Sequence, residues 1–313
     1  MPCCSGVDLK IATLEVTSVL AWMHMINFLQ TYPYYYLCVA FLFGISIGSF
    51  LNVLIYRLPL MLQKEWQTQS MEVLGLPDAA NESDITPFNL CVPRSHCPHC
   101  RKTIPFHRNL PILSFLLQRG KCFSCKAKIS WRYPLVEWLA GLLAVLCVWH
   151  FGVTWQTPMA MIFCFTLLSL CFIDLESFLL PDNLTLFLLW VGLLLSVFPL
   201  FIPSHAAILG ATLGYLTLWG IAKIFYFFTR VEGMGYGDFK LAAALGAWLG
   251  WQFIPLLISL AAILALLIGG AFMLRKKLAL RAPIPFGPFL SLSGLVLLFW
   301  GQAMMTAYTG LLC

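Results

Sequence analysis

Two aspartates at the edges of apolar segments are the residues best placed to do chemistry. Asp174 follows the apolar run 157–173, and Asp238 lies in GMGYGDFK, residues 233–240. Acidic side chains at membrane depth are costly and usually mark a functional site or pathway. If the two carboxyls share a site, both cannot ionise cheaply, so one keeps its proton. The charged carboxylate could then take a proton from water while its partner polarises a peptide carbonyl, which predicts peptide hydrolysis without a covalent intermediate.

Other functions are open to the same two aspartates. Acids near helix ends often cap helices without any catalytic role, as they would in a scaffold protein. A transporter would use them to relay ions, although such acids are expected nearer the membrane midplane. Asp182, which follows Pro181, is typical of a turn and helix N-cap. Glu176 and Glu232 are interpreted as solvated loop charges.

Four cysteines form the second group with chemical potential. Cys97 and Cys100 are one CxxC pair, and Cys122 and Cys125 are another, after 21 intervening residues. Two such pairs let four thiolates converge on one Zn²⁺, which predicts a closed, structural metal site. Disulfides and unrelated buried thiols are the competing interpretations, and a reducing cytoplasm argues against the first. His99 is predicted to lie outside the ligand set.

The elements that position these residues are predicted to be membrane helices. A chain of 313 residues with 60% hydrophobic and 10% charged side chains cannot form an ordinary soluble core with a polar shell. About 20 helical residues cross a bilayer. The apolar stretch at 241–274 is too long for one span, and the break at 250–252 before Pro255 divides it into two. The sequence predicts an all-α polytopic membrane protein with about eight transmembrane helices. Besides the two spans in that stretch, the predicted spans are 34–56, 134–151, 157–174, 183–203, 206–228 and 284–312.

Charge distribution orients these spans. Loops that face the cytoplasm carry an excess of Lys and Arg. With the N-terminus outside, the inner loops hold nearly all of the basic residues, and these loops are 57–133, 174–182, 229–240 and 275–283. Asp174 and Asp238 both fall on that inner side. The net charge of +6 therefore reflects orientation, and no nucleic-acid ligand is expected.

Four segments follow from this layout. Residues 1–33 are expected to be a tail or an interfacial helix, and 34–56 are the first transmembrane helix. Residues 57–133 form a small cytoplasmic insertion that contains the four cysteines. Residues 134–313 are the transmembrane core that carries both aspartates.

Several motifs, in order along the chain, resemble those of the prepilin peptidases, also called type IV leader peptidases. They are GSFLNVLIYRLP at 48–59, the paired cysteine knuckles, DLESFLLPDNLT at 174–185 and GMGYGDFK at 233–240. The last is also similar to the GxGD element of other intramembrane aspartyl proteases. The family's two catalytic aspartates fall on Asp174 and Asp238.

The resemblance implies a function. Members remove a short basic leader from type IV prepilins or type II secretion pseudopilins, after a glycine, at the cytoplasmic face of the bacterial inner membrane. Many then methylate the new N-terminal residue with S-adenosylmethionine, and the tetracysteine domain accompanies that bifunctional form. A peptidase without methyltransferase activity is the alternative. No GxGxxG turn between a strand and a helix is recognisable, so the methyl-donor residues stay unassigned.

Overall fold

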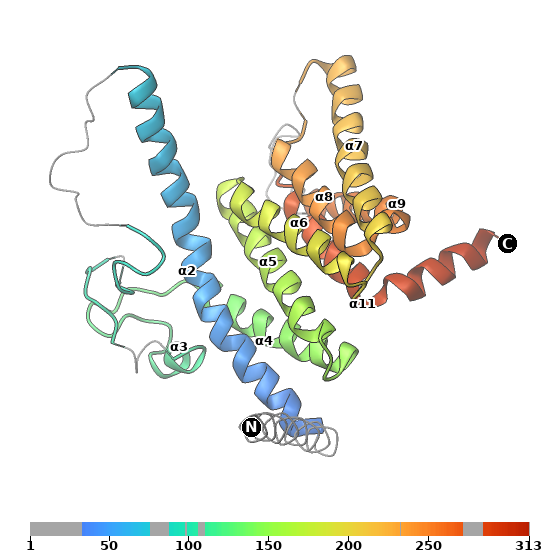
Figure 1. The fold of residues 1–313 in the computed structure, drawn as a ribbon. Coiled ribbons are helices and arrows are strands. Elements are labelled where there is room, and N and C mark those ends of the chain that lie inside the picture. The colour runs from blue at the N-terminus through green and yellow to red at the C-terminus, as the bar shows by residue number, and fades with distance from the viewer. Residues whose placement is uncertain are drawn as a thin grey trace, which may run out of the picture.

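The computed structural model of the chain is helical throughout its described part (Figure 1). The structure describes residues 33–75, 88–97, 99–105, 110–231, 233–271 and 284–312. In these ranges no strand is formed, and two isolated antiparallel bridges are the only β pairings. The expectation for the N-terminal tail, residues 1–33, falls almost wholly outside these ranges, and so does Glu232.

The first described helix, α2, extends well beyond the predicted span 34–56. It runs Pro33–Val73 and includes Pro59. Residues 60–73 are rich in Leu, Met, Gln, Glu and Lys, which favour helix, so nothing stops the helix where the apolar run ends. At about 1.5 Å per residue α2 is about 60 Å long, twice the thickness of the hydrocarbon layer. Its C-terminal end projects past the other helices of its group (Figure 1).

Two more helices pack with α2 to form the first group. They are α4 (Arg132–Phe151) and α5 (Gln156–Ser177). Small residues let α2 approach α4 closely, because a Cβ at Gly44 would lie only 2.6 Å from the carbonyl oxygen of Ala140. Gly48, one turn on, meets the backbone of Glu137 in the same way. This spacing of glycines four apart is common between membrane helices. The short helix α3 (Leu113–Leu117) lies in the insertion between α2 and α4.

The second group surrounds α8 (Tyr236–Leu249), whose residues from Leu241 to Leu249 are all buried. Helices α6, α7 and α11 contact α8, and α5 joins the two groups through its contact with α11. The remaining bounds are α6 Asp182–Val197, α7 Ser204–Thr229, η3 Trp251–Phe253, α9 Ile254–Leu264, η4 Ala265–Gly269 and α11 Gly287–Leu312.

The predicted break in the long apolar stretch is confirmed. Helix α8 ends at Leu249, Gly250 follows with φ 93, and α9 begins at Ile254 with proline in its first turn. A positive φ of this size is open to glycine and strained for other residues. Gly250 therefore allows the chain to leave the helical path between α8 and α9.

Glycines also bring α7 against α8. A Cβ at Gly210 would overlap the backbone of Gly246, and a Cβ at Gly214 would overlap that of Ala242. Larger residues at these positions would force the two helices apart. The position of α8, and of the aspartate in its first turn, depends on this contact.

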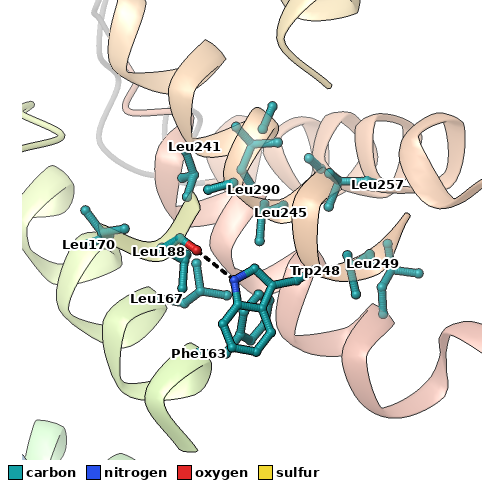
Figure 2. Packing of buried hydrophobic residues seen from close by; sticks show 14 of the residues in the cluster. Phe163, Leu167, Leu170, Leu188, Leu241, Leu245, Trp248, Leu249, Leu257 and Leu290 are labelled. Carbon is teal, nitrogen blue, oxygen red and sulfur yellow. Dashed lines mark hydrogen bonds between the residues drawn. The ribbon is translucent and has the colours of Figure 1, made fainter. Parts of the chain in front are cut away.

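The main apolar core lies where α5, α6, α8, α9 and α11 meet. Leu167, Leu245 and Leu290 are fully buried there, and Phe163 packs on Trp248 with ring centroids 4.9 Å apart. The indole N–H of Trp248 donates a 2.8 Å hydrogen bond to the carbonyl oxygen of Leu188 (Figure 2). A buried indole needs such a partner. The bond fixes α8 against α6 deep in the core.

Six helical segments of the described chain are long and apolar enough to cross a membrane. These segments are 34–73, 132–151, 156–177, 204–229, 251–269 and 287–307. Helices α6 and α8 occupy the other two predicted positions but have 16 and 14 residues. At about 21 to 24 Å they are shorter than the hydrocarbon layer. The chain is thus an all-α polytopic membrane protein, and the count of eight spans is not confirmed.

Candidate active site and metal centre

Asp174 lies in the last turn of α5 and is 5% exposed. Its carboxylate oxygen Oδ2 accepts a 3.0 Å hydrogen bond from the backbone N–H of Gly287, the first residue of α11. A Cβ at Gly287 would lie 2.6 Å from that oxygen, so a side chain there would displace the carboxyl. The hydrogen bond orients Asp174 and ties the end of α5 to the start of α11.

Asp238 lies in the first turn of α8 and is 7% exposed. Its Oδ1 is buried and has no hydrogen-bond partner among the described residues. A buried polar atom without a partner is costly, and functional sites are one place where such atoms occur. This oxygen is therefore a candidate to bind water or substrate.

The structure brings the two aspartates to one junction. Leu180, in the loop between α5 and α6, fills the space between the glycines beside them. A Cβ at Gly237 would lie 2.7 Å from Leu180, and a Cβ at Gly287 would lie 3.1 Å from it. Leu180 and Gly287 were not predicted from the sequence, since neither carries a reactive group.

Two of the glycines before Asp238 lie against neighbouring side chains of the same chain. Gly237 accommodates Leu180, and Gly233 accommodates the ring of Phe225 at 2.9 Å. None of Gly233, Gly235 and Gly237 has positive φ, so the segment before Asp238 does not use left-handed backbone.

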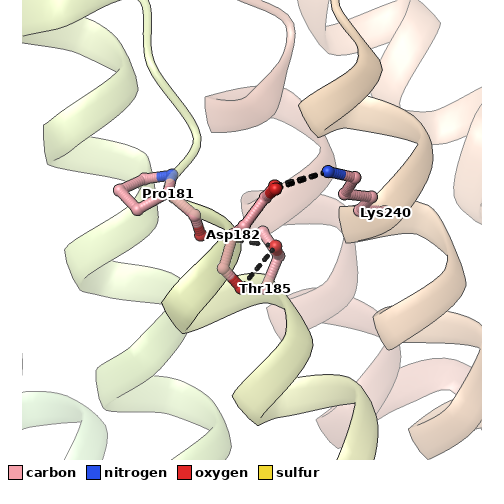
Figure 3. A network of polar contacts seen from close by, with 4 residues as sticks. All are labelled: Pro181, Asp182, Thr185 and Lys240. Carbon is pink, nitrogen blue, oxygen red and sulfur yellow. Dashed lines mark hydrogen bonds and ion pairs between the residues drawn. The ribbon is translucent and has the colours of Figure 1, made fainter. Parts of the chain in front are cut away.

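An ion pair flanks the aspartate junction. The Lys240 ammonium donates to both carboxylate oxygens of Asp182 at 2.6 Å, linking α8 to the first residue of α6 (Figure 3). The prediction that Asp182 caps α6 is wrong, because Pro181 occupies the cap position and no side chain caps the helix. The Asp182 side chain points to Lys240 instead. Glu176, predicted to be a solvated loop charge, lies within α5 and pairs with Arg132.

The four cysteines of the insertion converge as predicted. Their sulfur atoms all lie within 4.8 Å of one another, and the Sγ atoms of Cys97 and Cys125 are 3.8 Å apart. Four thiolates at about 2.3 Å from a tetrahedral Zn²⁺ are separated by roughly 3.8 Å, so the geometry fits zinc. The remaining ligands are Cys100 and Cys122. His99 is exposed and lies outside this group.

The two cysteine knuckles repeat the same backbone design. Cys97 N–H donates to the Lys102 carbonyl at 3.0 Å, and Cys122 N–H donates to the Ala127 carbonyl at 2.8 Å. The residue after each second cysteine, Arg101 or Lys126, has positive φ. The sequence analysis did not identify this repeat. Backbone N–H groups of Cys125 and Ser124 lower the pKa of the Cys122 thiol to about 6, which favours the thiolate that a metal needs.

Buried polar residues anchor the insertion to the membrane helices. The Arg57 guanidinium, 6% exposed, donates to the carbonyl oxygens of Asn89 at 2.8 Å and Pro93 at 2.5 Å. Glu137 on α4 accepts a 2.7 Å hydrogen bond from the backbone N–H of Ile112. Arg57 lies in the segment 48–59 that carried the family resemblance, but spacing alone predicted no role for either residue.

Comparison with known proteins agrees with this division of the chain. Residues 42–151, which include the four cysteines, match the bacterial peptidase A24 N-terminal domain. Residues 161–270, which include both aspartates, match the type IV leader peptidase family. No solved structure matches the chain.

Several curated relatives cover almost the whole chain, and each is called prepilin leader peptidase/N-methyltransferase. The relative from Stutzerimonas stutzeri is 45% identical over 91% of this chain and 98% of its own length. That from Aeromonas hydrophila is 46% identical over 88% and 94%, and that from Pseudomonas aeruginosa is 41% identical over 91% and 98%. The chain therefore belongs to the type IV leader peptidase family.

Proposed function

We propose that the chain cleaves the basic leader from type IV prepilins and type II secretion pseudopilins after a glycine, and then methylates the new N-terminal residue with S-adenosylmethionine. Cleavage takes place at the cytoplasmic face of the bacterial inner membrane and uses Asp174, Asp238 and a water molecule. Membership of a peptidase family and the names of the full-length relatives support both activities. The observation that carries the catalytic assignment is the burial of two acids at one junction of α5, α8 and α11.

In this proposal the two carboxyls share one proton, because like charges this close in a buried site do not both ionise cheaply. The Gly287 N–H orients Asp174, and the unpartnered Oδ1 of Asp238 faces the reacting groups. The carboxylate accepts a proton from water, and the protonated partner donates to the carbonyl oxygen of the scissile bond. The tetrahedral product of water attack then collapses with proton transfer to the leaving amine, so no covalent intermediate forms on the enzyme.

The substrate must present an extended backbone to these acids. Peptide bonds within a membrane helix are shielded by their own hydrogen bonds, so the pilin helix has to unwind locally before cleavage. A glycine before the scissile bond lowers the cost of that unwinding. At Gly235 a Cβ would meet only Oδ2 of Asp238, at 3.9 Å, so this glycine leaves room for a second chain next to Asp238.

The zinc that the four cysteines would hold has a structural role in this proposal. A site closed by four thiolates has no open position for water, so the metal cross-links the two knuckles and takes no part in hydrolysis. No residue is assigned to the methyl donor. The hydrogen bond between Ile112 and Glu137 of α4 supports a position of the insertion next to the membrane helices.

Mass spectrometry of a purified pilin precursor incubated with the purified protein tests the proposal. Without S-adenosylmethionine the expected product lacks the leader, and with it the product gains one methyl group at the new amino terminus. A trimmed but unmethylated product in both reactions would show that the chain is a peptidase without methyltransferase activity. An intact precursor in both reactions would contradict the proposal.

A further inference from the structure

The two knuckles have the same backbone but differ in charge. Each forms one antiparallel bridge, between His96 and Thr103 in the first knuckle and between Lys121 and Lys128 in the second. Like charges placed directly opposite each other across a β pairing are destabilising. The first knuckle shows that the backbone does not need two lysines at these positions. An anion between Lys121 and Lys128 would remove the repulsion.

A cavity opens at this lysine pair. Its volume is about 440 Å³. It is lined by Phe115, Leu116, Arg119, Gly120, Lys121, Lys128, Ile129 and Trp131. Arg119 adds a third cation, and residues 88–131 contain no Asp or Glu. In the described part of the chain none of the three cations forms an ion pair. The cavity thus combines uncompensated positive charge with an apolar wall.

The wall of the cavity adjoins the start of the second candidate membrane span. Trp131 is the residue before α4, the second candidate span, and is 75% exposed. Leu113, Leu116 and Leu117 of α3 are also exposed. Exposed tryptophan and leucine next to lysine and arginine are typical of segments that lie in the interface of an anionic bilayer. Phe115 packs edge-on against Trp131 with centroids 4.9 Å apart and fixes α3 to the start of α4.

We propose that this cavity binds the headgroup phosphate of an acidic phospholipid and thereby holds the insertion against the membrane surface. Clusters of Lys and Arg next to a membrane span attract such lipids. The basic leader of the proposed substrate carries the wrong charge for the cavity. S-adenosylmethionine, whose sulfonium and ammonium outweigh its single carboxylate, fits it less well than an anion.

Native mass spectrometry of the full-length, zinc-loaded protein in detergent tests the proposed lipid site. Phosphatidylglycerol or phosphatidylcholine is titrated into the protein, and the lipid that stays bound is measured. Lys121→Glu/Lys128→Glu is expected to weaken retention of phosphatidylglycerol roughly tenfold or more. The matched control is Arg101→Glu/Lys102→Glu, which makes the same change of charge at exposed positions of the first knuckle outside the cavity. The control is expected to retain the lipid within about twofold of the original protein.

Zinc content checks that the variants fold. If Lys121→Glu/Lys128→Glu loses metal, Lys121→Gln/Lys128→Gln takes its place in the lipid measurement, because it removes the charge without reversing it. Equal losses in the cavity variant and the control would overturn the proposal, as would equal retention of phosphatidylcholine. Hydrogen exchange over residues 113–131 distinguishes the source of the phosphate. Protection by phosphatidylglycerol alone supports a lipid site, and equal protection by inorganic phosphate would overturn it. Neither readout depends on peptidase or methyltransferase activity.

Discussion

The cysteine knuckles and the aspartate junction are built in opposite ways. In the knuckles the first cysteine of each pair is positioned by backbone hydrogen bonds to residues four or five positions away, such as Cys97 N–H to the Lys102 carbonyl. At the junction, Asp174 is held by Gly287, which is 113 residues away along the chain. The first region is therefore organised by local geometry around four thiols that could hold a metal, and the second by the packing of distant helices.

This difference decides what each region tolerates. The insertion is too small to bury much apolar surface, so the proposed metal would supply much of its stability. The junction depends instead on close helix contacts such as those of Gly210 with Gly246. Damage to one region is expected to leave the other folded, which the following predictions test in order of decreasing effect.

Loss of the metal is expected to have the largest effect on stability. Structural zinc sites contribute on the order of 10 kcal/mol to the folding of small domains. Cys97→Ser/Cys122→Ser should therefore lose bound zinc and all hydrogen-exchange protection in residues 95–104 and 120–129. The core of α5 and α8 should stay protected. The control is Cys91→Ser, an exposed cysteine of the insertion outside the metal group. Full zinc occupancy in the double variant would refute the metal site.

Loss of either catalytic carboxyl is expected to reduce activity rather than stability. Asp174→Asn or Asp238→Asn should slow cleavage of a pilin precursor roughly 10³-fold or more, since each removes one half of an acid–base pair. Zinc content should not change. Single-turnover cleavage measured by gel shift gives the rate, and cleavage by either variant within tenfold of the original protein would speak against the assignment.

Overpacking of the α7–α8 contact is expected to have an intermediate effect. Gly246→Ala places a Cβ against the backbone of Gly210 and should lower the free energy of unfolding by about 1–3 kcal/mol. Gly220→Ala is the control, because a Cβ there meets no atom within 4 Å. The control should leave the free energy of unfolding unchanged or raise it by up to about 1 kcal/mol. Thermal unfolding in detergent gives the unfolding temperature of each variant. Equal shifts of that temperature in both variants would show that the contact between α7 and α8 is not tight.

The Asp182–Lys240 ion pair is expected to have the smallest effect. Both side chains are partly exposed, and exposed pairs contribute at most about 1 kcal/mol. Lys240→Met or Asp182→Asn should reduce cleavage about twofold to fivefold, because the pair only helps to position α8. The variant with both substitutions should lose no more cleavage activity than either single variant. A loss above tenfold in Asp182→Asn would instead give Asp182 a direct part in the reaction.

The sequence predicted the reactive groups better than their surroundings. Acids at membrane depth and paired CxxC motifs are recognisable from residue type and spacing, and the break at Gly250 from its neighbours. Leu180 and Gly287 were missed because their role comes only from the way α5, α8 and α11 meet. The extension of α2 to Val73 was missed because helix propensity continues where hydropathy stops. Asp182 was taken for a cap because its partner Lys240 lies 58 residues further along the chain.

The most direct test of the aspartate junction is a double-mutant cycle on single-turnover cleavage with Asp174→Asn, Asp238→Asn and both together. Two carboxyls that share one proton act as a unit, so the double variant should cleave no more slowly than either single variant. Multiplied losses, with measurable cleavage by each single variant and none by the double, would show that the two aspartates act independently and contradict a shared site.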